Sequence, residues 1–237
     1  MDINSHKMSI AEFKPVATGG FGCYSIKLFE RNRETRRGEC VVFAKLDKGA
    51  FYPRIQVHGP THYFVIKGDL LINETNYEEG DYIRITDDTE FTPGTANGCV
   101  VLCIYTGDYT RLTKQQSKKN IISTLVLNCT KSTDDKWHPD SRNSPDRRYL
   151  GIYRDETTNE RVVVAQLDAG VSFGHIRIPG VTHYYILKGD LVIDGGTYEE
   201  ETYIRIDAGA KYTPQTKSGC QVLCIYTSGF EKLSGLS

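Results

Sequence analysis

Short apolar stretches recur along the chain, with polar turns within or between them. In the first half they are Val41–Asp47, Tyr63–Ile72, Asp81–Ile85 and Cys99–Tyr105. They are rich in β-branched and aromatic residues, which favour strands. No stretch keeps the 3.6-residue apolar spacing of an amphipathic helix. Many short strands at even spacing, separated by turns such as Thr92-Pro-Gly94, predict an all-β sandwich or barrel.

The chain contains an internal repeat. The stretch THYFVIKGDL at Thr61–Leu70 returns as THYYILKGDL at Thr182–Leu191, which is 121 residues later. The same offset relates Tyr82–Ile85 to Tyr203–Ile206, and Leu102–Thr106 to Leu223–Thr227. A repeat of this length without a gap indicates a duplicated domain rather than a short solenoid unit.

The repeat predicts the domain organisation. We expect an N-terminal barrel over residues 1–110 and a C-terminal barrel over residues 121–237. Residues 111–120 are expected to form a polar linker, because the segment Asp108–Asn120 (DYTRLTKQQSKKN) is polar and basic and is typical of a solvated connector.

Charge and composition exclude several classes of protein. The chain has 29 Lys and Arg against 30 Asp and Glu, a formal net charge of −1 that argues against a nucleic-acid binder. Its longest apolar run, Cys99–Tyr105, is too short to span a bilayer, and the first ten residues lack the apolar core of a secretory signal. The seven cysteines show no zinc spacing and are typical of reduced cytosolic thiols. We therefore expect a cytoplasmic protein with no nucleic acid and no membrane as partner. A small-molecule ligand and a second copy of the chain, in a homodimer, are the partners we expect instead.

Three glycine motifs occur in both halves of the chain. They are the turns Leu46-Asp-Lys-Gly49 and Leu167-Asp-Ala-Gly170, the strand ends Val65-Ile-Lys-Gly68 and Ile186-Leu-Lys-Gly189, and the pairs Gly98-Cys99 and Gly219-Cys220. Together they resemble the cupin superfamily, and the doubled pattern resembles a bicupin. Among cupins the chain is similar to the ChrR-type anti-sigma-factor family, which also resembles dihydroxyacetophenone and acetylacetone dioxygenases. The resemblance implies two tandem double-stranded β-helix (jelly-roll) barrels and leaves function open, because function depends on the site residues.

The resemblance also implies where a metal would bind. Such cupins usually hold one metal per barrel with a His-x-His pair, a Glu and a later His, ligands that suit Fe, Zn, Mn or Ni. Counted from Gly68 and Gly189, these positions are Ile55, Val57, Thr61 and Phe91, and Ile176, Ile178, Thr182 and Tyr212. We therefore predict no metal and no other cofactor, and a cavity for an organic ligand lined by these eight residues. Tyr63 and Tyr184 are added to this set, because their hydroxyl groups can orient a ligand.

A second alignment frame gives a different site. A slip of one residue exchanges the two faces of a strand, so that His58, His62 and His183 would face inward as metal ligands. Beside them the first repeat would offer Gln56 and the second Arg177, so the two copies disagree. This frame remains open as an alternative metal site.

Two classes of function follow. The first is a metal-free bicupin that binds a small apolar or aromatic molecule in one or both barrels. The alternative is a cupin enzyme, either a metal-dependent dioxygenase or a metal-free isomerase or oxygenase that uses a His base and a Tyr acid. The candidates would be His62 with Tyr63, or His183 with Tyr184 and Tyr212, but neighbouring residues on a strand point to opposite faces. The sequence assigns no catalytic residue and does not decide whether the protein is an enzyme.

Overall fold

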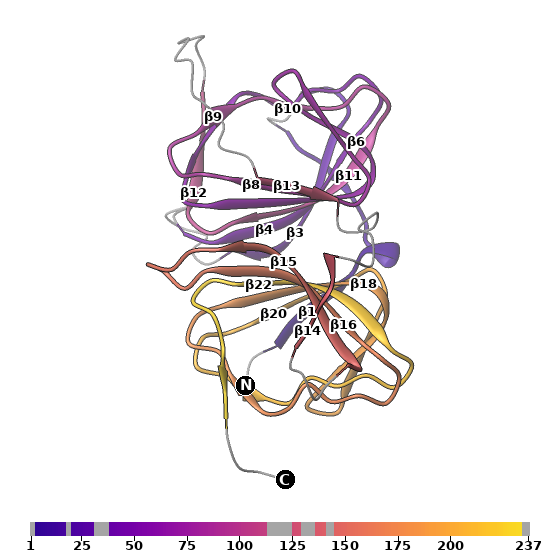
Figure 1. Cartoon of the computed structure of the whole chain (residues 1–237). Coiled ribbons are helices and arrows are strands. Elements are labelled where there is room, and N and C mark those ends of the chain that lie inside the picture. Colours follow the sequence, from indigo (N-terminus) through magenta and orange to yellow (C-terminus); the bar gives the residue numbers. More distant parts are fainter. Residues whose placement is uncertain are drawn as a thin grey trace. The chain divides into compact units, whose positions relative to one another are not determined.

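The computed structural model of the chain contains two barrel-like units built from β-sheets (Figure 1). It describes residues 3–17, 20–30, 38–112, 125–128 (backbone only), 136–140 and 145–233. One unit, the N-terminal barrel, comprises Glu12–Lys131, and the other, the C-terminal barrel, combines Met1–Ala11 with Ser132–Ser237. The predicted all-β fold with two barrels is confirmed. Within the described residues, no helix has the length and apolar character needed to cross a membrane.

The N-terminal barrel consists of a large and a small antiparallel sheet. Its described strands are β2 (Lys14–Pro15), β3 (Cys23–Glu30), β4 (Cys40–Leu46), β5 (Ile55–His58), β6 (Thr61–Ile72), β7 (Thr75–Glu78), β8 (Asp81–Ile85), β9 (Glu90–Phe91), β10 (Pro93–Gly94), β11 (Cys99–Tyr105), β12 (Asp108–Arg111) and β13 (Leu125–Asn128). The large sheet has the order β13-β8-β6-β11-β4-β3-β2, with β7 and β10 also paired to β6, and the small sheet has the order β12-β5-β9.

The C-terminal barrel repeats this arrangement. Its described elements are β1 (Ile3–Lys7), the 3-10 helix η1 (Met8–Ile10), β14 (His138–Pro139), β15 (Arg147–Arg154), β16 (Arg161–Leu167), β17 (Ile176–Arg177), β18 (Thr182–Ile193), β19 (Gly196–Glu199), β20 (Thr202–Ile206), β21 (Lys211–Tyr212), β22 (Cys220–Tyr226) and β23 (Glu231–Lys232). The large sheet has the order β1-β20-β18-β22-β16-β15-β14, and the small sheet has the order β21-β17-β23.

The strand that precedes each repeat completes the sheet of the other repeat. Strand β1 pairs with β20, where Asn4 lies opposite Arg205. Strand β13 pairs with β8, where Leu125 lies opposite Arg84. The two pairings are equivalent, because Arg84 and Arg205 are related by the repeat offset, as are Asn4 and Leu125. The units therefore differ from the expected ranges 1–110 and 121–237 at both of these strands.

The predicted linker over residues 111–120 begins inside the barrel. Arg111 is the last residue of β12, which pairs with β5 and places Arg111 opposite Ile55. The backbone amide of Leu112 then donates a hydrogen bond of 2.9 Å to the carbonyl oxygen of Arg54. The remainder of the predicted linker, residues 113–120, lies outside the described residues.

Glycine is required where the long strands β6 and β18 bend. Gly68 and Gly189 have φ angles of +79° and +78°, a region that favours glycine. A Cβ atom at either position would lie 1.9 Å from the backbone carbonyl oxygen of Gly98 or Gly219. Just before Gly68, the register between β6 and β11 shifts by one residue, which is the geometry of a β-bulge. The glycine of the repeated motif therefore allows the bulge and the close approach of two backbones.

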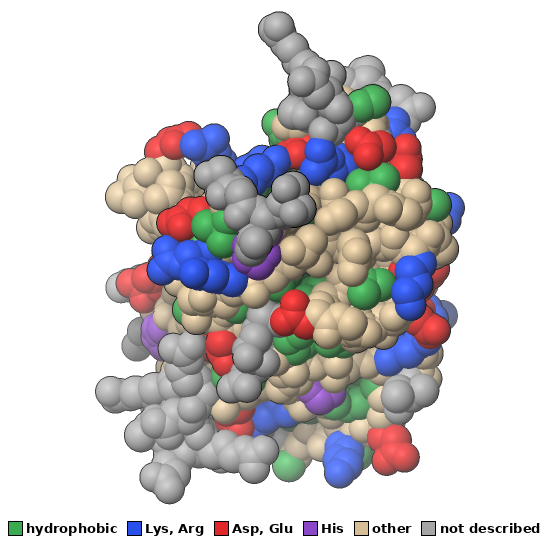
Figure 2. Space-filling view, turned by 90° about the horizontal axis from the view of Figure 1, so that it is seen from below, with side chains coloured by type: hydrophobic (Ala, Val, Ile, Leu, Met, Phe, Trp, Pro, Cys, Tyr) green, Lys and Arg blue, Asp and Glu red, His purple; other side chains and the backbone are tan. Residues whose placement is uncertain are grey.

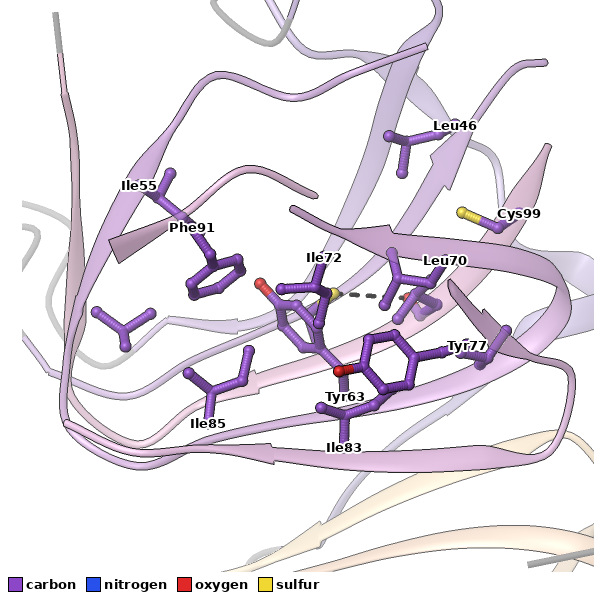
Figure 3. Close-up of a cluster of buried hydrophobic side chains, with 14 of the residues drawn as sticks. Leu46, Ile55, Tyr63, Leu70, Ile72, Tyr77, Ile83, Ile85, Phe91 and Cys99 are labelled. Carbon is purple, nitrogen blue, oxygen red and sulfur yellow. Dashed lines mark hydrogen bonds between the residues drawn. The ribbon is translucent and has the colours of Figure 1, made fainter. Parts of the chain in front are cut away.

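Alternation along the strands decides which side chains fill each barrel. On β6, Tyr63 and Val65 belong to the buried interior cluster, together with Ile83 and Ile85 from β8 (Figure 3). His62 lies between two inward positions and therefore on the opposite face of the sheet. On the outer surface, basic and acidic side chains are interspersed over the face seen in Figure 2, as expected from the near balance of charges.

Candidate ligand-binding site

In the N-terminal barrel, the residues at the predicted metal-ligand positions lie in the interior. Ile55 and Phe91 lie opposite each other on β5 and β9. Both belong, with Val57 and Tyr63, to the buried cluster, and Figure 3 shows Ile55, Phe91 and Tyr63 within it. Thr61 is also buried, and its hydroxyl donates a hydrogen bond of 3.3 Å to the carbonyl oxygen of Gly59.

The second set occupies the same places in the C-terminal barrel. Ile176 and Tyr212 lie opposite each other on β17 and β21. Ile178 and Tyr184 join them in the interior cluster, and Thr182 is fully buried. The hydroxyl oxygens of Tyr184 and Tyr212 are 2.6 Å apart. The structure thus brings each predicted set of residues into one barrel interior.

These side chains do not fit a metal ion. Ile55, Val57, Ile176 and Ile178 are fully buried and offer only carbon atoms. Fe, Zn, Mn and Ni sites need imidazole, thiolate or carboxylate ligands. Among the residues that the structure describes, no group of three or more His, Cys, Asp or Glu side chains is placed to hold a metal.

The histidines of the slipped frame are not directed into the barrel interiors. His62 is buried on the face of β6 opposite Tyr63, and its Nδ1 atom lies 2.7 Å from the hydroxyl oxygen of Tyr82. His58 is exposed on β5, with Nε2 2.7 Å from the hydroxyl oxygen of Thr110. The structure therefore does not bring His58 and His62 together as an inward-facing pair.

His183 is in the same situation in the C-terminal barrel. Its Nδ1 atom lies 2.8 Å from the hydroxyl oxygen of Tyr203. Burial, followed by the positive charge of Arg205, lowers the pKa of His183 to about 3, so the imidazole is neutral at physiological pH. His183 and Tyr184 point to opposite faces of β18, as do His62 and Tyr63 on β6. The acid–base pairs considered from the sequence are therefore not assembled; each histidine pairs with a tyrosine of the neighbouring strand instead.

A cavity of about 690 Å³ opens beside the interior cluster of the N-terminal barrel. Of the ten residues predicted to contact a ligand, Tyr63 lines this cavity and Tyr184 lines its much smaller counterpart in the C-terminal barrel. The apolar and aromatic residues of the cavity wall include Val42, Ala44, Leu46, Tyr52, Tyr63, Leu70, Pro93, Val101, Tyr105 and Tyr109. The other predicted contacts in this barrel, such as Ile55 and Phe91, pack in the cluster behind Tyr63.

Polar groups also line the cavity, among them tyrosine hydroxyls and the guanidinium of Arg111, beside the charged side chains of Lys27, Lys45, Glu30, Glu39 and Asp108. The hydroxyl oxygens of Tyr63 and Tyr105 are 2.7 Å apart. Arg111 donates a hydrogen bond of 2.9 Å from Nε to the hydroxyl oxygen of Tyr52, and a second from Nη2. The hydroxyl oxygen of Tyr109 is 3.5 Å from that of Tyr52. Burial raises the pKa of Tyr52, Tyr63 and Tyr105, so these hydroxyl groups stay protonated at neutral pH.

Three thiol groups, those of Cys23, Cys40 and Cys103, also line the cavity. Burial raises the pKa of Cys40 to about 11, raises that of Cys103 well above its usual value, and also raises that of Cys23. Because the thiolate is the nucleophilic form, none of the three cysteines is activated for covalent catalysis at neutral pH.

Larger side chains fill the equivalent space in the C-terminal barrel, which retains about 40 Å³. Ser25 lies opposite Ala44 on β4, whereas Tyr149 lies opposite Ala165 on β16. Likewise, the C-terminal barrel has Arg161 at the position that Cys40 occupies in the N-terminal barrel. The guanidinium carbon of Arg161 lies 5.3 Å from the ring centroids of both Tyr149 and Phe230, a cation–π arrangement that closes the space.

Sequence reasoning missed most of the cavity wall, because it searched for what the two repeats share. The cavity depends on positions at which they differ. Under the repeat offset these include Tyr52 and Phe173, Tyr109 and Phe230, and Cys40 and Arg161. These differences are the sequence signal that distinguishes the open barrel from the filled one.

Comparison with protein families agrees with the doubled barrel. The model of the ChrR Cupin-like domain matches residues 6–110 and again residues 128–229. The chain belongs to this cupin family. It is a bicupin, with one copy of the domain in each half. No curated protein matches the chain.

Solved structures of other bicupins share the fold. A candidate dioxygenase from Nostoc punctiforme is 12% identical and has a TM-score of 0.71, with 99% of this chain and 85% of that chain covered. A salicylate 1,2-dioxygenase variant from Pseudoaminobacter salicylatoxidans, bound to gentisate, is 14% identical with a TM-score of 0.66 and coverage of 95% and 82%. An oxalate decarboxylase variant from Bacillus subtilis is 10% identical with a TM-score of 0.64 and coverage of 97% and 79%. At these identities the likeness concerns the fold alone.

Proposed function

We propose that this bicupin binds one small apolar or aromatic molecule per chain, in the cavity of the N-terminal barrel, and does so without a metal. The observation that carries the proposal is the difference between the two barrels, about 690 Å³ of cavity in one and about 40 Å³ in the other. Cavities of 300–1,000 Å³ with apolar walls and a few directed polar groups are typical of small-molecule sites.

The chemistry of the cavity wall supports an aromatic ligand. The ring of Tyr105 lies 4.7 Å from that of Tyr109 and 5.9 Å from that of Tyr63, measured between centroids. These rings offer both faces and edges to a flat apolar molecule, and aromatic pairs of this kind add stability beyond the area they bury. Hydrogen bonds to the hydroxyl groups of Tyr52 and Tyr63 then fix the orientation of the ligand in the cavity.

The enzymatic alternatives receive less support. The metal-dependent alternative needs ligands where this chain has Ile55, Val57, Thr61 and Phe91. The His–Tyr alternative needs His62 and Tyr63 on one face of β6, and they lie on opposite faces. We therefore propose binding, and not catalysis, as the function of the N-terminal barrel.

Titration with N-phenyl-1-naphthylamine tests this proposal. This neutral aromatic fluorophore is expected to bind with a stoichiometry of one per chain, because the second barrel is filled. It should also raise the midpoint of thermal unfolding, since a ligand of the native state stabilises that state. Fluorescence without saturation, or two equivalents bound per chain, would contradict the proposal.

Elemental analysis tests the metal-free part. Protein purified without chelator is expected to contain well under one equivalent of Fe, Zn, Mn, Ni or Cu per chain, because the positions described above offer no imidazole or carboxylate. A stoichiometric amount of any of these metals would restore the dioxygenase alternative.

A further inference from the structure

We infer that the ligand of the N-terminal barrel carries a negatively charged group, the carboxylate of an aromatic acid, which is bound by Arg111 with the hydroxyl groups of Tyr52 and Tyr109. This inference rests on the proposed function, because it specifies the ligand class of the same cavity. None of these three residues is among those predicted from the sequence to contact a ligand.

The first argument is the position of Arg111. Tyr109 and Arg111 are two residues apart on β12, hence on the same face, and they lie opposite Val57 and Ile55, whose side chains face the interior. Both line the cavity. The guanidinium carbon of Arg111 lies 5.2 Å from the ring centroid of Tyr52, a cation–π contact with another residue of the cavity wall.

The second argument is the unused hydrogen-bonding capacity of this guanidinium. It has five N–H donors, and Nε and Nη2 both donate to the single hydroxyl oxygen of Tyr52. Among the described residues, no Asp or Glu side chain forms an ion pair with Arg111. A guanidinium fork suits a carboxylate, which accepts two parallel N–H donors.

The third argument is that two of the three acidic residues lining the cavity, Glu30 and Asp108, accept hydrogen bonds from donors other than Arg111. Glu30 accepts a hydrogen bond of 2.7 Å from Lys27, and Asp108 accepts one of 2.7 Å from the amide of Tyr109. Among the described residues, neither carboxylate forms an ion pair with Arg111.

The fourth argument is the contrast with the filled barrel. The residues equivalent to Tyr52, Tyr109 and Arg111 are Phe173, Phe230 and Lys232. Both hydroxyl groups are absent there, and Lys232 forms an ion pair of 2.6 Å with Asp140 while lying 4.9 Å from the ring centroid of Phe173. The two hydroxyl groups and the guanidinium therefore occur together in the barrel that has a cavity. In the filled barrel, the equivalent cation is paired with a carboxylate of the chain.

Displacement of N-phenyl-1-naphthylamine by two matched competitors tests the inference. 1-Naphthoate carries a carboxylate, and 1-naphthamide has the same rings with a neutral amide. The wild-type chain is expected to release the fluorophore at a concentration of 1-naphthoate about tenfold lower than that of 1-naphthamide, since a charge-assisted hydrogen bond contributes about this factor. The preference should decrease as salt is added.

Variants assign the preference to Arg111. Arg111→Gln is expected to reduce it to within about twofold, whereas Lys232→Gln, at the equivalent position of the filled barrel, should leave it unchanged. Tyr52→Phe removes one hydroxyl and keeps the ring, and should reduce the preference while the fluorophore still binds. It also serves as the informative variant if Arg111→Gln fails to fold.

The outcomes separate the two proposals. Fluorophore binding with equal displacement by both competitors, or a preference that survives both Arg111→Gln and Tyr52→Phe, would overturn the inference and leave the cavity as a neutral site. Absence of saturable fluorophore binding to the wild-type chain would overturn the proposed function itself.

Discussion

Replacing Ser25 with Tyr and Cys40 with Arg is expected to abolish fluorophore binding, with an affinity loss of at least about 100-fold. The pair copies Tyr149 and Arg161, which occupy the equivalent space in the C-terminal barrel. An introduced Arg can stack on the ring of Tyr109, which stands where Arg161 meets Phe230. Because the space is already hollow, filling it should not overpack the core, and the thermal unfolding midpoint should be retained. Titration and thermal unfolding of the same preparation check both expectations.

The reciprocal variant is the matched control. Tyr149→Ser with Arg161→Cys removes the two large side chains from the C-terminal barrel and should raise the number of bound fluorophores from one to two per chain. It should also lower stability by about 2–5 kcal/mol, since emptying a packed interior leaves a cavity. An unchanged affinity in the filled N-terminal variant, with normal unfolding, would show that the fluorophore binds elsewhere.

Gly68→Ala is expected to destabilise the protein by more than about 3 kcal/mol, and Gly189→Ala by a similar amount. At both positions the added Cβ would lie 1.9 Å from a backbone carbonyl oxygen, which cannot move without breaking the pairing of β6 with β11 or of β18 with β22. The φ angle of nearly +80° adds strain for any residue with a Cβ atom. Urea unfolding followed by circular dichroism measures the effect.

Two other glycines distinguish the cost of a positive φ angle from the cost of a steric clash of the added Cβ atom. Gly49 and Gly170 have φ angles of +75° and +77°, but no described heavy atom lies within 4 Å of a Cβ built there. Gly49→Ala and Gly170→Ala should therefore cost only about 1–2 kcal/mol, the penalty of the left-handed conformation alone. Equal losses at all four positions would contradict the argument from the close backbone approach.

The repeat made the fold predictable, because it locates the same glycine motifs on strands in both halves of the chain. Counting along a strand from the motif glycine then gives the face of the sheet on which each residue lies. Ile55 and Phe91 are inside the barrel for this reason: the gap-free frame counts correctly from Gly68 to the strands that carry them. The assignment of these residues as ligand contacts stays a prediction. Alternation reports the face of a side chain, but not whether the interior behind it is filled or empty.

The cavity was not predictable in the same way, because its size depends on summed side-chain volumes. Ser25 and Tyr149 occupy equivalent positions but are 124 residues apart, since β3 and β15 do not follow the offset of the later strands. A comparison at constant offset therefore does not align them. Arg111 was missed for another reason: the basic segment after it made the end of β12 resemble the start of a linker.

The pairing of β1 with β20 and of β13 with β8 bears on how such a chain can arise by duplication. In a polypeptide that contains one repeat alone, the open edge of the sheet can be covered either by its own leading strand or by that of a second copy. The exchange seen within this chain corresponds to the second arrangement, a strand-swapped dimer. Fusing two copies of the gene makes this exchange of strands intramolecular. In a homodimer both barrels have the same sequence, whereas in the fused chain the two barrels can differ. One barrel can therefore lose its cavity while the other keeps it.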